Sequence, residues 1–327
     1  QASMLYEQRS DGSFFDVTAK TGLHYPDSKC MGQTVYDYDE DGDLDIFQAN
    51  DHQLNFLFIR DGKVFREAGI KSGVAANSDG LGSGSMHGTL GDVDGDGLTD
   101  ILVTDLEHSA LYRNLGNGLY EDIAVRSGIA AQLKGKGGWG AALTDYDNDG
   151  DLDIVSANGT AEELILQYPL LLINDGKGNF SNGASTAGEY FTTKRSGRGL
   201  ALIDYDNDGD QDVVINHVDK DGSTVLLRND GGNRNHWLGL ILKSRDGSHP
   251  AIGTKVTIMQ GGIKQVRIFN PSTGYLSNSD PRILFGLGEN GTVDSIEIKW
   301  AGGRTEVFRN IRSDRYNVIK EGEGITK

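Results

Sequence analysis

The stretch DYDNDGDLDI, residues 145–154, places five aspartates at alternate positions around a single glycine. Carboxylates this close together repel one another unless a cation lies among them. In the spacing DxDxDGxxD, the first, third, fifth and ninth residues bring side-chain oxygens to one point, and the glycine allows the sharp turn between them. The chain contains four such loops: loop 1 (37–45), loop 2 (92–100), loop 3 (145–153) and loop 4 (204–212).

Oxygen ligands in this number favour Ca²⁺ over softer metals. An EF-hand is excluded because position twelve, which would be a bidentate Glu, is Gln48, Val103, Ser156 or Ile215. We therefore expect about four structural calcium ions, one in each loop, that offset the repulsion and stabilise the fold. The predicted ligands are Asp37, Asp39, Asp41, Asp45, Asp92, Asp94, Asp96, Asp100, Asp145, Asp147, Asp149, Asp153, Asp204, Asp206, Asp208 and Asp212.

The negative charge of the chain is concentrated in these loops. The formal net charge of the 327 residues is −17, and the four loops contain 20 of the 48 acidic residues. The rest of the chain is close to neutral. A charge of this sign argues against nucleic acid as a partner. No run of 18 apolar residues occurs, so we expect no insertion into a membrane.

The loops recur at intervals of 55, 53 and 59 residues, which is typical of a repeat array or propeller. A short strand rich in small residues precedes each loop, an alternating strand follows it, and turns rich in Asn, Asp and Gly come next. This pattern predicts an all-β chain of four-stranded antiparallel units, with almost no helix. The N-terminal stretch 4–23 matches the second half of a unit, so we expect the termini to share a blade. From about residue 233 the strands continue without Asp loops.

The repeats at 30–231 resemble FG-GAP/VCBS calcium repeats, the blades of integrin-like propellers. Residues 235–311 are similar to the ASPIC/UnbV module, through NHWLGLIL (235–242), QVRIFNPSTGYLSNSD (265–280) and FGLGENGTVDSIEIKW (285–300). We expect a calcium-stapled β-propeller of five to seven blades in total. Its predicted domains are 1–232, the propeller repeats, and 233–327, a β module that closes or caps the propeller. The resemblance implies a secreted or surface protein but no single activity.

The face opposite the Asp loops collects a second set of candidate residues. If the loops lie at the bottom of each unit, five of the seven histidines fall in or beside segments at the top: His24, His52, His87, His108 and His217. His87 stands where the other units have glycine. With Trp139 and Arg198, they suggest a pocket for a polar ligand. The candidate catalytic residues are His52, His87, His108 and His217, and the candidate ligand-binding residues are Trp139, Arg198, His87 and Asp105.

Two functions are consistent with this face. The first is an extracytoplasmic binding, adhesion or scaffold protein for a glycan or protein ligand, including a subunit of a larger surface assembly. The alternative is a calcium-dependent enzyme, lyase-like or a hydrolase, that acts on a carbohydrate or small metabolite through the histidines. A transition metal bound by the histidines is a third reading. The calcium loops and a first residue other than Met suggest a secreted, periplasmic or cell-surface location, and the single cysteine, Cys30, allows no internal disulfide.

Overall fold

The computed structural model describes residues 3–106, 108–161, 164–218, 222–246 and 251–326, and the prediction of an all-β fold is confirmed. Helix is restricted to α1 (Gly69–Ser72), α2 (Ile129–Leu133) and the 3₁₀ turns η1 (Glu189–Thr192) and η2 (Gly232–Arg234). None of the helices in these ranges is long and apolar enough to cross a membrane.

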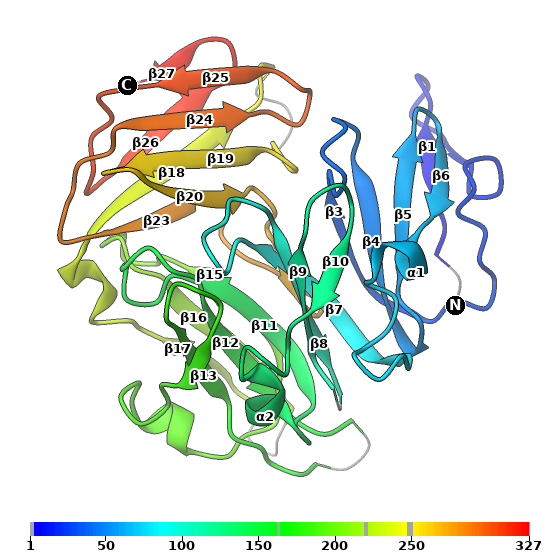
Figure 1. The fold of residues 1–327 in the computed structure, drawn as a ribbon, viewed down its shortest axis with the longest axis horizontal. Coiled ribbons are helices and arrows are strands. Elements are labelled where there is room, and N and C mark those ends of the chain that lie inside the picture. The colour runs from blue at the N-terminus through cyan, green and yellow to red at the C-terminus, as the bar shows by residue number, and fades with distance from the viewer. Residues whose placement is uncertain (1–2, 107, 162–163, 219–221, 247–250, 327) are drawn as a thin grey trace.

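The repeats form four antiparallel units along the chain (Figure 1). Unit 1 contains β3 (Cys30–Tyr36), β4 (Asp45–Gln53), β5 (Phe56–Asp61) and β6 (Val64–Glu67). Unit 2 contains β7 (Ser83–Gly91), β8 (Asp100–Asp105), β9 (Ala110–Asn114) and β10 (Tyr120–Asp122). Unit 3 contains β11 (Gly138–Thr144), β12 (Asp153–Asn158), β13 (Leu170–Asn174) and β14 (Phe180–Asn182). Unit 4 contains β15 (Gly197–Ile203), β16 (Asp212–His217) and β17 (Thr224–Leu227).

Each Asp loop joins the first strand of its unit to the second. The first strands β3, β7, β11 and β15 lie beside one another in that order. Their close approach explains a glycine in two of them, because a Cβ on Gly32 would lie 2.6 Å from the Met86 carbonyl oxygen and one on Gly140 would lie 2.6 Å from that of Arg198. The hydrophobic core is built between consecutive units. Phe47 of unit 1 packs in one cluster with Ile101 of unit 2, and the same holds between units 2 and 3 and between units 3 and 4.

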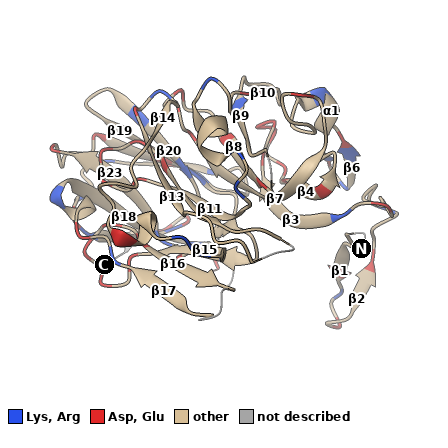
Figure 2. Cartoon of the chain, turned by 90° about the horizontal axis from the view of Figure 1, so that it is seen from below, with Lys and Arg blue, Asp and Glu red and all other residues tan. Residues whose placement is uncertain are grey.

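Two details differ from the expected repeat. Units 1 and 2 share one eight-stranded sheet. The C-terminal end of β4 pairs with the start of β7, at Asp51↔Gly84 and Gln53↔Ser83. The expectation that the termini share a blade is not met in the described part of the chain. The N-terminal strands β1 (Tyr6–Gln8) and β2 (Phe14–Asp16) pair only with each other. Their hairpin stands apart from the other sheets, as Figure 2 shows.

The C-terminal module contains two four-stranded sheets and a hairpin. One sheet has the order β23 (Ile283–Gly288), β18 (His236–Lys243), β26 (Tyr316–Lys320) and β27 (Gly324–Thr326). The other has the order β20 (Ile263–Ile268), β19 (Lys255–Gln260), β24 (Ser295–Lys299) and β25 (Thr305–Phe308). The two sheets contribute to one core cluster. The hairpin of β21 (Ser272–Gly274) and β22 (Ser277–Asn278) leaves this core and packs against β7, β11 and β15.

Candidate functional site

The first aspartate of every loop is held by the glycine at position six. The N–H groups of Gly42, Gly97, Gly150 and Gly209 donate to Oδ2 of Asp37, Asp92, Asp145 and Asp204 at 3.1, 2.9, 3.1 and 3.1 Å. These glycines have φ values from +87° to +107°. A residue with a Cβ is strained in that conformation, so the glycine of the motif is required by the turn itself.

The aspartate at position nine connects its loop to the rest of the unit. In loop 2, the N–H of Val93 donates to Asp100 Oδ2 at 2.9 Å and the N–H of Asn114 donates to Asp100 Oδ1 at 2.8 Å. The first bond lies within the loop and the second reaches the third strand of the unit. Only the remaining lone pairs of this carboxylate are available to an ion. The same two bonds recur at Asp45, Asp153 and Asp212.

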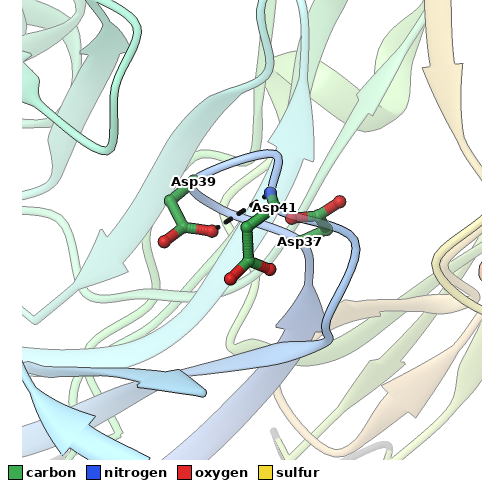
Figure 3. A group of neighbouring side chains, drawn as sticks. All are labelled: Asp37, Asp39 and Asp41. Carbon is green, nitrogen blue, oxygen red and sulfur yellow. Dashed lines mark hydrogen bonds between the residues drawn. The ribbon is translucent and has the colours of Figure 1, made fainter. Parts of the chain in front are cut away.

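The carboxylates in each loop fit a hard cation. One ligand oxygen from each of three aspartates lies within 4.8 Å of the others in every loop, and Figure 3 shows Asp37, Asp39 and Asp41 of loop 1 around the turn. Oδ1 of the buried residues Asp37, Asp92 and Asp145 has no hydrogen-bond partner. A buried carboxylate oxygen without a partner is costly, and a metal ion held in the loop could satisfy these three atoms.

Burial also opposes the charge of these carboxylates. Desolvation raises the pKa of Asp92 to about 6, that of Asp145 to about 7 and that of Asp100 to about 8. At Asp145 the neighbouring guanidinium of Arg267 lowers the pKa and offsets part of this effect. A divalent cation in the loop would stabilise the ionised form that burial disfavours.

Loop 4 departs from the other three. Its ligand group contains Asp204, Asp206 and Asp212, without the position-five residue Asp208. The Oδ2 atom of Asp208 accepts a hydrogen bond from Asn233 Nδ2 at 2.5 Å. Both oxygens of Asp204 have protein partners, since Oδ1 accepts the N–H of Asp208 at 3.1 Å and Oδ2 accepts the hydroxyl of Tyr316 at 2.5 Å. Loop 4 is therefore bound by the protein around it as well as by its own backbone.

Two of the predicted ligand-binding residues do meet. The guanidinium of Arg198 lies 4.4 Å from the ring centroid of Trp139, and the ring of Tyr275 lies 5.0 Å from Trp139 in an edge-on arrangement. Arg198 also donates to the Thr160 carbonyl at 2.7 Å, which fixes its plane. Tyr275 comes from the turn of the β21–β22 hairpin, and from the sequence it was expected in the core of the C-terminal module and not at a ligand site. An adjoining hollow of about 290 Å³ has a lining that includes Arg198, Leu200, Val214, Asn216, Tyr275 and Leu276.

His87 contacts the C-terminal module and does not line an open pocket for a ligand. It is buried, and its Nε2 lies 3.2 Å from the Ser272 carbonyl oxygen. Two residues further along β7, the Thr89 hydroxyl donates to the Thr273 carbonyl at 3.0 Å. Desolvation lowers the pKa of His87 to about 4. The histidine in place of the usual glycine thus faces the hairpin that fills the space between the first strands.

The structure does not bring the other candidate residues together with His87. His217 is buried and bonded to the Tyr190 hydroxyl at 2.8 Å and the Ser223 carbonyl at 2.9 Å. His52 and His108 are exposed on separate units, and Asp105 accepts the N–H of His108 at 2.7 Å. Within the described ranges, no histidine belongs to a group of three potential metal ligands. His87 and His217 thus make their hydrogen bonds to residues outside the candidate set, and a site formed by the histidines stays a prediction.

Sequence reasoning also missed a set of asparagines that connect neighbouring units. Asn174 Nδ2 of unit 3 donates to the Val93 carbonyl in loop 2 at 2.8 Å, and Asn229 Nδ2 of unit 4 donates to the Tyr146 carbonyl in loop 3 at 2.7 Å. Asn174 ends the third strand of its unit and Asn229 lies just after the third strand of its own, where the sequence pattern predicted only hairpin turns. An asparagine recurs at this place in units 2, 3 and 4, as Asn114, Asn174 and Asn229, and this recurrence was the signal that could have identified them.

Comparisons with known proteins identify two families in the chain. The FG-GAP-like repeat family matches residues 37–103 and 92–156, which include loops 1 to 3. The ASPIC and UnbV family matches residues 244–326. The chain carries FG-GAP-like repeats and an ASPIC/UnbV domain. Strand β18 precedes the matched part of the ASPIC/UnbV domain, although it pairs with β23 and β26 inside it.

Curated relatives with this similarity include cartilage acidic protein 1. The human protein is 24% identical over 322 residues, which is 98% of this chain and 40% of the relative. The mouse protein is 27% identical over 322 residues, 98% of this chain and 41% of the relative. The FG-GAP repeats and ASPIC/UnbV domain described here therefore span about two fifths of the length of these relatives.

Among solved structures, one similar chain is an Agrocybe aegerita lectin whose title describes recognition of non-reducing terminal N-acetylglucosamine. Its TM-score is 0.38 at 16% sequence identity, over 70% of this chain and 62% of the lectin. A likeness of this strength supports no conclusion about the function of the FG-GAP repeats.

Proposed function

We propose that this chain is an extracellular calcium-stapled propeller that acts as a binding or scaffold protein. The observation that carries the calcium assignment is the buried, unpartnered Oδ1 atom of Asp37, Asp92 and Asp145. When bound, Ca²⁺ would supply positive charge and coordination to these oxygens. The chain's own residues prepare the site, because the glycine N–H at position six fixes Oδ2 and leaves Oδ1 directed elsewhere.

The propeller assignment rests on how the units pack. The first strands lie side by side, the apolar faces of consecutive units form the core, and the β21–β22 hairpin occupies the space next to the first strands. This is the arrangement expected of blades around an axis. A total of five to seven blades, with the ASPIC/UnbV domain as a cap, remains our prediction.

The binding role rests on the site formed by Trp139, Arg198 and Tyr275. An aromatic face, a fixed guanidinium and an adjoining hollow are features of a site for a polar ligand such as a glycan or a protein side chain. The similarity to cartilage acidic protein 1 favours a secreted protein with partners in an extracellular assembly. The alternative, an enzyme that uses the histidines, has no comparable group of contacts among the described residues to support it.

Elemental analysis of the purified protein before and after EGTA dialysis tests the calcium assignment. We expect about four calcium ions per chain, removal by EGTA and a lower melting temperature without the ions. An unchanged calcium content or melting curve would refute it.

A glycan and matrix-protein array tests the binding role. It should show binding that Trp139→Ala abolishes, whereas Tyr6→Phe, an exposed control, should leave the binding unchanged.

A further inference from the structure

Three side chains of the ASPIC/UnbV domain contact loop 4. The Tyr316 hydroxyl donates to Asp204 Oδ2 at 2.5 Å, and Arg282 donates to the Asn207 side chain and the Asp204 carbonyl, each at 2.5 Å. Trp237 lies directly against Gly209, where a Cβ would lie 1.8 Å from its ring. The domain therefore contacts the loop at its first, fourth and sixth positions. We call Trp237, Arg282 and Tyr316 the clamp.

The clamp is held together by its own packing. The guanidinium of Arg282 lies 4.4 Å from the ring centroid of Tyr316, whose ring is 5.2 Å from that of Trp237. A Cβ on Gly239, in β18, would lie 2.4 Å from the Tyr316 ring, so this glycine makes room for the tyrosine. The three side chains thus form one packed group beside the sheet that contains β18, β23 and β26, with the rings of Trp237 and Tyr316 edge-on to each other.

The clamp adds little net charge next to the loop. The phenol of Tyr316 is neutral, and Arg282 forms an ion pair with Asp280 of its own domain. A free cation at this place would compete with Ca²⁺ for the carboxylates, whereas a neutral donor orients a carboxylate without opposing the ion. The contacts with Asp204 use Oδ2 and the backbone carbonyl, and Oδ1 accepts only the N–H of Asp208 within the loop.

The same domain contacts loop 3 through two backbone N–H groups and through Arg267, whose guanidinium lies 3.5 Å from Asp145 Oδ2. The N–H of Gly286 donates to Asp145 Oδ2 at 3.0 Å, and the N–H of Gly288 donates to the Asn148 carbonyl at 2.9 Å. Both donors belong to β23, which shares a sheet with the clamp strands. Docking of the domain therefore reaches loops 3 and 4, and Lys299 of the same domain also contacts Asp37 of loop 1 at 3.2 Å.

Loop 2 provides an internal contrast. Its Asp94 and Asp96 are bound by Arg113 of β9, in the same unit. Lys264 of the ASPIC/UnbV domain passes close to Gly97, but no hydrogen bond between the described residues joins that domain to a carboxylate of loop 2. We therefore expect loop 2 to bind calcium without contacts from the ASPIC/UnbV domain to its carboxylates.

We propose that the ASPIC/UnbV domain is a calcium-linked clamp, in which Tyr316 positions the Asp204 carboxylate and calcium in loop 4 strengthens docking of the domain. This rests on the proposed calcium binding by the loops. A docked domain holds the loop in its binding geometry and so lowers the ordering cost of binding. By thermodynamic linkage, calcium in the loop strengthens docking by the same factor.

Hydrogen exchange of the full chain, with and without calcium, tests the linkage in a matched pair of variants. Asp206→Asn and Asp94→Asn remove the position-three carboxylate of loop 4 and of loop 2. Each variant should bind one calcium fewer than the wild type. Calcium should slow exchange in β26 of the wild type and of Asp94→Asn, but not of Asp206→Asn.

Calorimetric titration of Tyr316→Phe should show one site weakened about tenfold, the effect of losing a hydrogen bond to a charged group. Tyr6→Phe is the control.

The outcomes separate the two proposals. If the wild type binds no calcium, the proposed calcium function fails and the clamp fails with it. If both aspartate variants lose one calcium but calcium still protects β26 in Asp206→Asn, the loops are calcium sites and the clamp is wrong. Calcium affinities in Tyr316→Phe equal to those of the wild type would also overturn it.

Discussion

Loops 2 and 4 have the same DxDxDGxxD spacing but different surroundings. In loop 2, the charged partner is Arg113 from the same unit, and Oδ1 of Asp92 has no partner. In loop 4, Tyr316 and Arg282 come from the ASPIC/UnbV domain, and both oxygens of Asp204 are bonded. The motif thus determines which carboxylates are present, and their neighbours determine how many oxygens need an ion.

The largest expected effect tests what the two loops share. Asp100→Ala and Asp212→Ala each leave two backbone N–H groups without an acceptor, and both aspartates are fully buried. At about 2 kcal/mol for each unsatisfied donor, we expect a loss of about 4 kcal/mol in the free energy of unfolding. Urea denaturation measures it, with the exposed Asp61→Ala as the control. Clearly unequal losses would show that position nine has different roles in the two loops.

Calcium removal should separate the two loops. Each site saturated at a hundred times its Kd contributes about 2.7 kcal/mol, so EGTA should lower the free energy of unfolding by several kcal/mol. The loss of order should be larger in loop 2, because Asp92 Oδ1 is then left without any partner. Hydrogen exchange across 93–99 and 205–211 compares them directly. Faster exchange in loop 4 than in loop 2 would contradict this account.

A smaller effect concerns the other docking contact of the ASPIC/UnbV domain, at His87. The pKa of His87 is about 4 in the folded protein because of burial, whereas the unfolded chain binds its proton near pH 6.5. A lowered pKa means that stability is lost as the pH falls below 6.5. We expect about 2 kcal/mol between pH 7 and pH 5. His87→Gln should remove this part of the pH dependence of unfolding, and an unaltered pH profile would refute the assignment.

The smallest expected effect is a change in calcium affinity that has opposite signs in the two loops. Arg113→Met removes a cation from Asp94 and Asp96, so calcium should bind loop 2 more tightly, whereas Tyr316→Phe should weaken loop 4. The Arg113 side chain is about a third exposed, so solvent screens the pair and the gain should be only about twofold. Calorimetric titration of both variants measures the signs. Weaker binding in Arg113→Met would mean that the arginine orients the carboxylates of loop 2.

Much of the fold could be predicted because its signals are local. The strands around each loop follow from alternation and from turn residues, and Gly42 is explained by the turn that it makes. The neighbourhood of Trp139 and Arg198 followed from their equivalent places in successive repeats. Tyr275 could not be found in this way, because it reaches Trp139 from a domain that does not share the repeat.

The sequence by itself determined the four loops, their hard oxygen ligands and the all-β repeat, since spacing and turn chemistry act over a few residues. Only the tertiary structure decided which oxygens stay free for an ion and what His87 contacts. Those answers depend on pairs far apart in the chain, such as Asp204 with Tyr316 and His87 with Ser272. Docking of the ASPIC/UnbV domain brings them together, and no local pattern encodes where that domain binds.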